Sequence, residues 1–213
     1  MFCEGNMKHL DYSQQEAWRE ADDTVWQSPI AINSKQTQTV MASDLALTFN
    51  GRTQYDDRIV GEQFLVSGEL IIAREKWSLE RFHFHDGAEH TVDGIRHDVE
   101  IHFVYRRENR ILVLAVFGDV SNQPIDTHIK DVFADTIDAK ILANWLPKSH
   151  SYYSYVGSLT TPPLGEGVTW VILTETISVG VDDLAIIHEH YPDNYRKVQD
   201  IAGRDVLSVR VTK

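Results

Sequence analysis

Short hydrophobic runs recur along the chain, and most are bounded by Gly, Asn, Asp or Pro. Their lengths and their content of Val, Ile and Phe favour strands, because a helix usually needs a longer stretch with a period of 3.6 residues. The sequence therefore predicts a mainly β fold, with strands over residues 45–49, 63–68, 69–73, 80–85, 98–106, 110–118, 168–174 and 206–211.

Two other segments show helical spacing. One runs from Pro124 to about Thr136, where the apolar residues fall on one stripe of a helix. The other is the segment 181–191, "VDDLAIIHEHY", which opens with an acidic pair typical of a helix start. We expect both helices to pack at the periphery of a sheet.

Alternation within two of the predicted strands brings imidazoles onto one face. His83 and His85 share a face of one strand, whereas the phenylalanines beside them point the other way. Glu100 and His102 share a face of the next strand, and a turn over residues 91–98 would let that strand fold back antiparallel to the first. Three imidazoles would then converge from two strands.

Three neutral imidazoles that leave a fourth position open are the ligand set of a catalytic zinc site. Nearby carboxylates would receive the second N–H of each ligating ring. Two other interpretations stay open on these residues alone. A His-x-His pair on a strand is often only a surface or packed pair, and His83-x-His85-x-x-x-Glu89 also fits the first half of a cupin signature for iron or manganese. The Pro-x-Gly of that signature's second half does not precede His102.

Length indicates the number of domains, and net charge excludes some classes of partner. A chain of 213 residues is long enough for one sizeable core and short for two, so we expect a single domain over residues 1–213. The net charge of −12 argues against nucleic acid or an anionic membrane as partner, because neither would be bound without a clustered basic face.

Targeting signals and cysteine content suggest the compartment. No stretch approaches the roughly 18 consecutive apolar residues that span a bilayer, and the first residues lack the pattern of a signal peptide. Cys3 is the single cysteine, so neither an internal disulfide nor a cysteine-rich zinc cluster can form. We expect a cytoplasmic protein, unless a leader was removed, with any metal held by nitrogen and oxygen ligands.

Five separated blocks of the sequence resemble the α-class carbonic anhydrases, in the order of that family and over nearly the whole chain. They are residues 27–32 (QSPIAI), 82–94 (FHFHDGAEHTVDG), 100–104 (EIHFV), 157–170 (GSLTTPPLGEGVTW) and 194–204 (NYRKVQDIAGR). The resemblance implies a mainly β fold with peripheral helices around a central, largely antiparallel twisted sheet. It also implies reversible hydration of carbon dioxide to bicarbonate and a proton by zinc-bound hydroxide, and a homodimer as one arrangement.

The resemblance assigns roles to individual residues. It implies three zinc ligands, His83, His85 and His102. Thr160 would accept a hydrogen bond from the hydroxide and donate its own to Glu89, and Glu100 would hold the ring of His102. The apolar wall that receives carbon dioxide would comprise Val104, Val113, Leu159 and Trp170, with Thr161 near bound bicarbonate.

The chain departs from the family pattern at several positions. Gln63 stands where many members carry a proton-shuttling histidine, and glutamine does not titrate, so we expect slow, buffer-dependent proton release. Arg81 replaces a glutamine that supports the first zinc histidine, and arginine cannot accept that histidine's N–H. Asp86 replaces a tryptophan, and Leu164 stands where secreted members place a disulfide cysteine.

Two alternative functions remain beside the anhydrase. A non-catalytic zinc- or ligand-binding module of the same fold would be distinguished by whether water on its metal titrates near neutrality. A cupin-type enzyme would be distinguished by the identity of its metal. The three-histidine set is complete, unlike that of the family's zinc-free relatives, which have lost a ligand.

Overall fold

The computed structural model describes residues 9–19, 25–42 and 45–211, and Cys3 lies outside these residues. Strands dominate the described chain, which confirms the mainly β prediction. They are β1 (Ala31–Ile32), β2 (Gln38–Ala42), β3 (Leu45–Arg58), β4 (Gly61–Ile72), β5 (Glu75–Asp86), β6 (Thr91–Val92), β7 (Val99–Arg107), β8 (Arg110–Val120), β9 (Tyr152–Ser158), β10 (Glu166–Leu173), β11 (Ile177–Val179) and β12 (Leu207–Val211).

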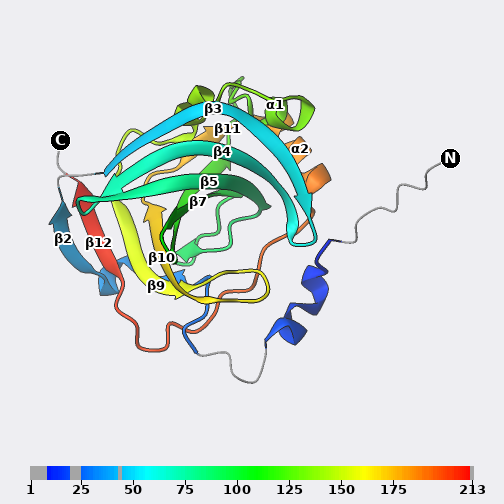
Figure 1. Ribbon diagram of the computed structural model, residues 1–213. Helices are drawn as coiled ribbons and strands as arrows, with labels where there is room; N and C mark the ends of the chain where they lie inside the picture. The colour runs from blue at the N-terminus through cyan, green and yellow to red at the C-terminus, as the bar shows by residue number, and fades with distance from the viewer. Residues whose placement is uncertain (1–8, 20–24, 43–44, 212–213) are drawn as a thin grey trace.

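A ten-stranded sheet organises the described residues. Its order is β2-β12-β9-β10-β8-β7-β5-β4-β3, with β11 added on β8. The run from β3 to β8 is antiparallel throughout, whereas β8 pairs with β10, and β12 with β2, in parallel. Strands β3, β4, β5 and β7 arch beside one another, and β2 and β12 form the far edge (Figure 1). The sheet is therefore mixed and largely antiparallel, as expected.

Each predicted strand matches an observed one to within one residue beyond its ends, with one difference in how they are divided. The runs 63–68 and 69–73 belong to the single strand β4. Gly68 lies at their junction, where a side chain would collide with the backbone carbonyl of Thr48 on β3. The glycine that suggested a break instead allows a close approach of two strands.

One helix prediction is confirmed and the other is too long. Helix α2 (Val181–His190) matches the second segment, but α1 covers only Ile129–Ala134. The buried carboxylate of Asp183, on α2, accepts hydrogen bonds from the Thr127 hydroxyl and from the backbone N–H of Lys130. These bonds tie the segment at the start of α1 to α2. Asp183 is thus not a cap of its own helix, whose N-cap is Gly180.

The other helices are short 3-10 segments. They are η1 (Tyr12–Trp18), η2 (Ser34–Gln36) and η3 (Ala139–Trp145). No helix in the described ranges is both long and apolar enough to cross a bilayer.

Both faces of the central strands are covered. On one face an aromatic core fills the space beneath α1, α2 and η3, and Phe82 lies fully buried within it. Phe82 stacks on Phe64 at a ring-centroid distance of 5.0 Å and meets Trp145 edge-on at 5.4 Å. On the other face a second apolar cluster surrounds Trp170. The histidines of β5 lie on this second face, because they alternate with Phe82 and Phe84.

Truncation of Phe82 tests how far the aromatic core supports the strand that carries the histidines. We expect Phe82→Ala to lower the free energy of unfolding of the metal-free protein by about 3–5 kcal/mol, since the cavity cannot collapse between two covered faces. Ile71→Ala is the control, because Ile71 on β4 is 41% exposed and its loss should cost less than about 1 kcal/mol. Urea unfolding of both variants measures the difference, and equal costs would contradict this account of the core.

Candidate metal centre

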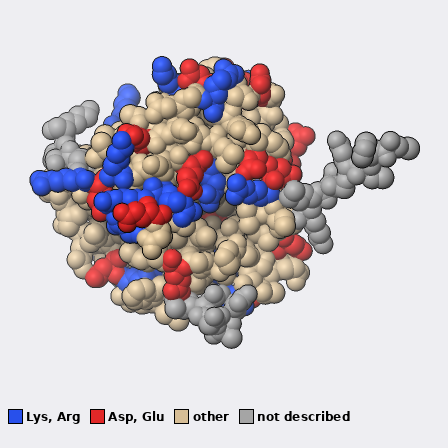
Figure 2. Space-filling model, in the orientation of Figure 1, with Lys and Arg blue, Asp and Glu red and all other residues tan. Residues whose placement is uncertain are grey.

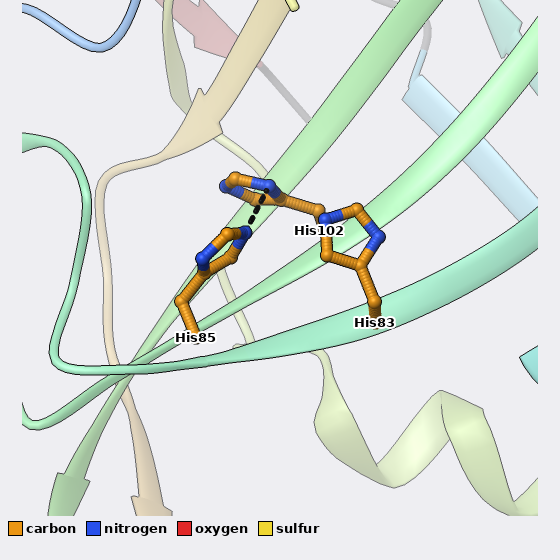
Figure 3. Close-up of side chains that lie close together, drawn as sticks. All are labelled: His83, His85 and His102. Carbon is orange, nitrogen blue, oxygen red and sulfur yellow. Dashed lines mark hydrogen bonds between the residues drawn. The ribbon is translucent and has the colours of Figure 1, made fainter. Parts of the chain in front are cut away.

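The pairing of β5 with β7 brings the three histidines together. His83 lies directly opposite His102 in the antiparallel register, and His85 lies opposite Glu100. The three rings turn toward a common space, with possible ligand atoms all within 4.8 Å of one another (Figure 3). The closest pair is Nε2 of His85 and Nδ1 of His102, at 3.1 Å. The convergence expected from strand alternation is therefore present.

The remaining ring nitrogens of two histidines are fixed from behind. Nδ1 of His85 donates to the backbone carbonyl of Asn194 at 2.7 Å, and Nε2 of His102 donates to Oε1 of Glu100, also at 2.7 Å. An oxygen partner can only accept, so each ring carries a proton on that side and turns its other nitrogen inward. Two lone pairs 3.1 Å apart repel each other unless a cation or a proton lies between them.

The third histidine is held differently. Among the described residues the ring of His83 has no hydrogen-bond partner, and Arg81 forms no bond with it. Burial lowers the pKa of His83 well below its ordinary value, and repulsion from His85 and His102 adds to this effect. Burial also lowers the pKa of His85. Both rings are therefore neutral near pH 7, as ligation requires.

These features fit a divalent zinc ion. Tetrahedral Zn–N bonds of about 2.0–2.1 Å place two ligand nitrogens about 3.3 Å apart, close to the 3.1 Å between His85 and His102. The donor set is three converging imidazoles, and the same histidines line a cavity. These three histidines could therefore hold a metal ion, and their chemistry fits zinc.

A buried polar network supports His102. Oε1 of Glu100 also accepts from Nδ1 of His90 at 2.8 Å, and Oε2 accepts the His90 backbone N–H at 2.9 Å. Nε2 of His90 lies 2.7 Å from the hydroxyl of Tyr155, which in turn lies 2.8 Å from Oγ of Ser28. Burial opposes ionisation of Glu100, but His90 and His102 outweigh it and hold its pKa well below the usual range.

His90 is a site residue that sequence reasoning did not identify. It is not among the candidate site residues predicted from the sequence, yet its side chain is fully buried. Its position inside the block 82–94 was the available signal. Its partner Tyr155 comes from β9, a strand that the hydrophobic pattern did not predict.

Glu89 is fully buried beside the histidines. Its Oε1 accepts the backbone N–H of Arg196 at 2.8 Å, and its Oε2 lies 3.5 Å from Nε2 of His85. Oε2 has no hydrogen-bond partner among the described residues. Thr160 is buried and lines the same cavity, but no hydrogen bond joins it to Glu89 in this structure. One carboxylate oxygen therefore faces the site without a donor.

Residues 194–196 close the site from the C-terminal half of the chain. The side-chain oxygen of Asn194 accepts the backbone N–H of Asp86 at 2.7 Å, and its amide donates to the carbonyl of Phe84 at 2.9 Å. The same residue accepts from His85, and Arg196 donates to Glu89. The block 194–204 was recognised in the sequence, but these backbone contacts were not foreseeable from it.

A cavity leads from the histidines to the surface. Its lining includes all five residues named from the sequence as substrate contacts: Val104, Val113, Leu159, Thr161 and Trp170. Gln63 also lines it and donates from Nε2 to Oδ2 of Asp56 at 3.3 Å. Tyr12 lines it too, although it was not singled out from the sequence, and burial beside Glu89 raises the pKa of its hydroxyl. One wall is apolar and the opposite rim is polar.

Comparisons with known proteins agree with this arrangement. A family model described as eukaryotic-type carbonic anhydrase matches residues 13–210. A carbonic anhydrase of Nostoc sp. is 32% identical over 76% of this chain and 63% of its own length, so the match leaves out more than a third of that relative. A carbonic anhydrase of Pectobacterium carotovorum is 27% identical over 85% of this chain and 79% of its own length.

Solved structures extend the likeness to the fold. The α-carbonic anhydrase of Photobacterium profundum superposes with a TM-score of 0.80 at 26% identity, covering 91% of this chain and 96% of that one. The family match spans β1 to β12 and contains every histidine of the metal centre. The chain therefore belongs to the α-class, eukaryotic-type family of carbonic anhydrases.

Proposed function

We propose that this protein binds zinc through His83, His85 and His102 and catalyses the reversible hydration of carbon dioxide to bicarbonate. The observation that supports this most directly is the convergence of three imidazoles in a cavity with an apolar wall. Family membership supports the same reaction. The cupin alternative receives no support from the comparisons.

Zinc held by these residues would lower the pKa of a bound water molecule to about 7 and so supply hydroxide, an effect for which carbonic anhydrases are themselves the standard example. The protein's part is to hold and surround the reactants. The wall formed by Val104, Val113 and Trp170 is buried and apolar, which suits carbon dioxide because that substrate has no charge to pair.

Glu89 and Thr160 would orient the nucleophile. The partnerless Oε2 of Glu89 needs a donor, because a buried carboxylate oxygen without one is costly. The hydroxyl of Thr160 can supply that proton, and its oxygen then accepts only from a donor within the cavity. Thr161 lies further along the same lining, where it would contact bicarbonate. These roles belong to the proposal.

Each turnover releases a proton, and this cavity offers no histidine at the position of Gln63. Glutamine holds its amide protons at any ordinary pH and cannot relay one. Its side chain is also committed to Asp56. We therefore propose that soluble buffer carries the proton away. Cytoplasmic location, a single domain and a homodimer stay predictions from the sequence.

Stopped-flow hydration of carbon dioxide tests the proposal. The protein with stoichiometric zinc should hydrate carbon dioxide, and His102→Ala should reduce the rate to background, because two imidazoles hold zinc poorly. Glu100→Gln should weaken zinc affinity by about 10–100-fold while leaving all three ligands in place. Zinc content measured on the same samples separates loss of metal from loss of chemistry. Full zinc occupancy without hydration would instead favour a non-catalytic binding module.

Buffer dependence tests the role of Gln63. Turnover should rise with buffer concentration, and Gln63→His should raise the low-buffer turnover on the order of tenfold by adding a group that titrates near neutrality. Gln63→Asn is the matched control and should give no gain. High turnover that ignores buffer in the unchanged protein would show that another group already performs the transfer.

The pH dependence of stability tests the neutral state of the imidazoles. The folded pKa of His83 lies below the unfolded value of about 6.5, so the unfolded chain takes up the proton first on acidification. The free energy of unfolding of the metal-free protein should therefore be level above that pH and fall below it. Urea unfolding between about pH 8 and pH 5.5 measures this slope, and His83→Gln should make it shallower. An unchanged slope would mean that His83 titrates normally.

A further inference from the structure

Arg81 places a guanidinium in the wall of the catalytic cavity. It lies two residues before His83 on β5, so both side chains emerge on the same face of the sheet. Its cross-strand neighbours are Leu65 on β4 and Val104 on β7, and Val104 belongs to the apolar wall. Arg81 itself lines the cavity together with the three histidines.

Most donors of this guanidinium have no protein partner. Arginine carries five N–H groups, yet Arg81 makes one long hydrogen bond among the described residues, from Nη1 to Oε2 of Glu80 at 3.4 Å. Glu80 is engaged more closely by Arg106, whose Nε donates to its other oxygen at 2.7 Å. The side chain of Arg81 is only 22% exposed, so bulk water does not surround these donors freely.

The local charge is also uncompensated. Arg58 pairs with Asp56 at 2.6 Å, whereas Arg106 and Arg81 share Glu80, at 2.7 Å and 3.4 Å. Three arginines thus share two carboxylates, and Arg81 has the longest of these contacts. Burial is the largest cause that lowers the pKa of Arg81, but a guanidinium stays protonated throughout the working range. Figure 2 shows that basic and acidic side chains lie side by side in a band across one face of the molecule.

We propose that Arg81 is an anion-binding residue that holds a small planar oxoanion, bicarbonate or a simple carboxylate, inside the cavity. A guanidinium presents parallel N–H donors that match two oxygens of such a group, which a point charge cannot do. Uncharged carbon dioxide gains nothing from it. The identification of bicarbonate as the natural ligand rests on the proposed function, whereas the subsite for planar oxoanions does not.

The subsite would act selectively on the charged side of the reaction. Bicarbonate would bind more tightly than in a cavity without Arg81, so the KM for bicarbonate in dehydration would be low. Hydration would be unaffected in its binding step and would become sensitive to planar anions. Arg81→Gln should therefore raise the KM for bicarbonate, and leave the KM for carbon dioxide unchanged.

Calorimetric titration of the zinc-loaded protein with sodium formate tests the proposal directly. Formate is planar and unreactive here, and iodide serves as a spherical anion for comparison. Arg81→Gln should weaken formate binding about tenfold or more, the loss expected for a charge-assisted hydrogen bond. Arg81→Lys keeps the positive charge but loses the parallel N–H donors of the guanidinium, so it should weaken the binding of formate more than the binding of iodide.

Arg58→Gln is the matched control, since it removes one arginine charge nearby on a side chain that does not line the cavity. It should change formate affinity by less than about twofold. Equal losses in Arg58→Gln and Arg81→Gln, or no loss in either, would overturn the subsite. Hydration measured on the same samples separates the two proposals. Formate binding that depends on Arg81 without hydration would retain the subsite and reject the anhydrase, and hydration with unchanged formate binding would do the reverse.

Discussion

The antiparallel register between β5 and β7 is the constraint on which the metal centre depends. It sets His83 opposite His102 and, by the same hydrogen-bond ladder, Phe82 opposite Phe103. Because side chains alternate, a slip of one residue would move the imidazoles into the aromatic core and the phenylalanines into the cavity. The same register therefore determines both the aromatic packing on one face and the grouping of the histidines on the other. Loss of this strand pairing would therefore separate the three histidines.

Burial then gives the centre its chemistry. Desolvation keeps His83 and His85 neutral, while Glu100 stays ionised because it accepts from two imidazoles and a backbone N–H. Arg81 is the exception on this wall, because it is charged, largely buried and poorly partnered. Such a group is costly unless a ligand completes it.

Much of this could be read from the sequence, because strand alternation is a local property. The positions of His83, His85, Glu100 and His102 on shared faces needed only the period of two, and most strands were bounded by visible turn signals. The late start of α1 could not be predicted from the local sequence. The carboxylate of Asp183, a residue far along the chain, binds the Thr127 hydroxyl in the segment that was expected to be helical. His90 could not be recognised as buried for the same reason, since its partners come from β7 and β9.

The contacts of Asn194 and Arg196 impose an order on assembly during synthesis. The three histidines leave the ribosome roughly ninety residues before the groups that fix His85 and Glu89. Until those groups arrive, the ring of His85 can rotate and present either nitrogen. A nascent chain therefore holds all three metal ligands before it can hold the metal firmly. Firm binding of a metal ion by these histidines is therefore expected only after residue 196 has been synthesised.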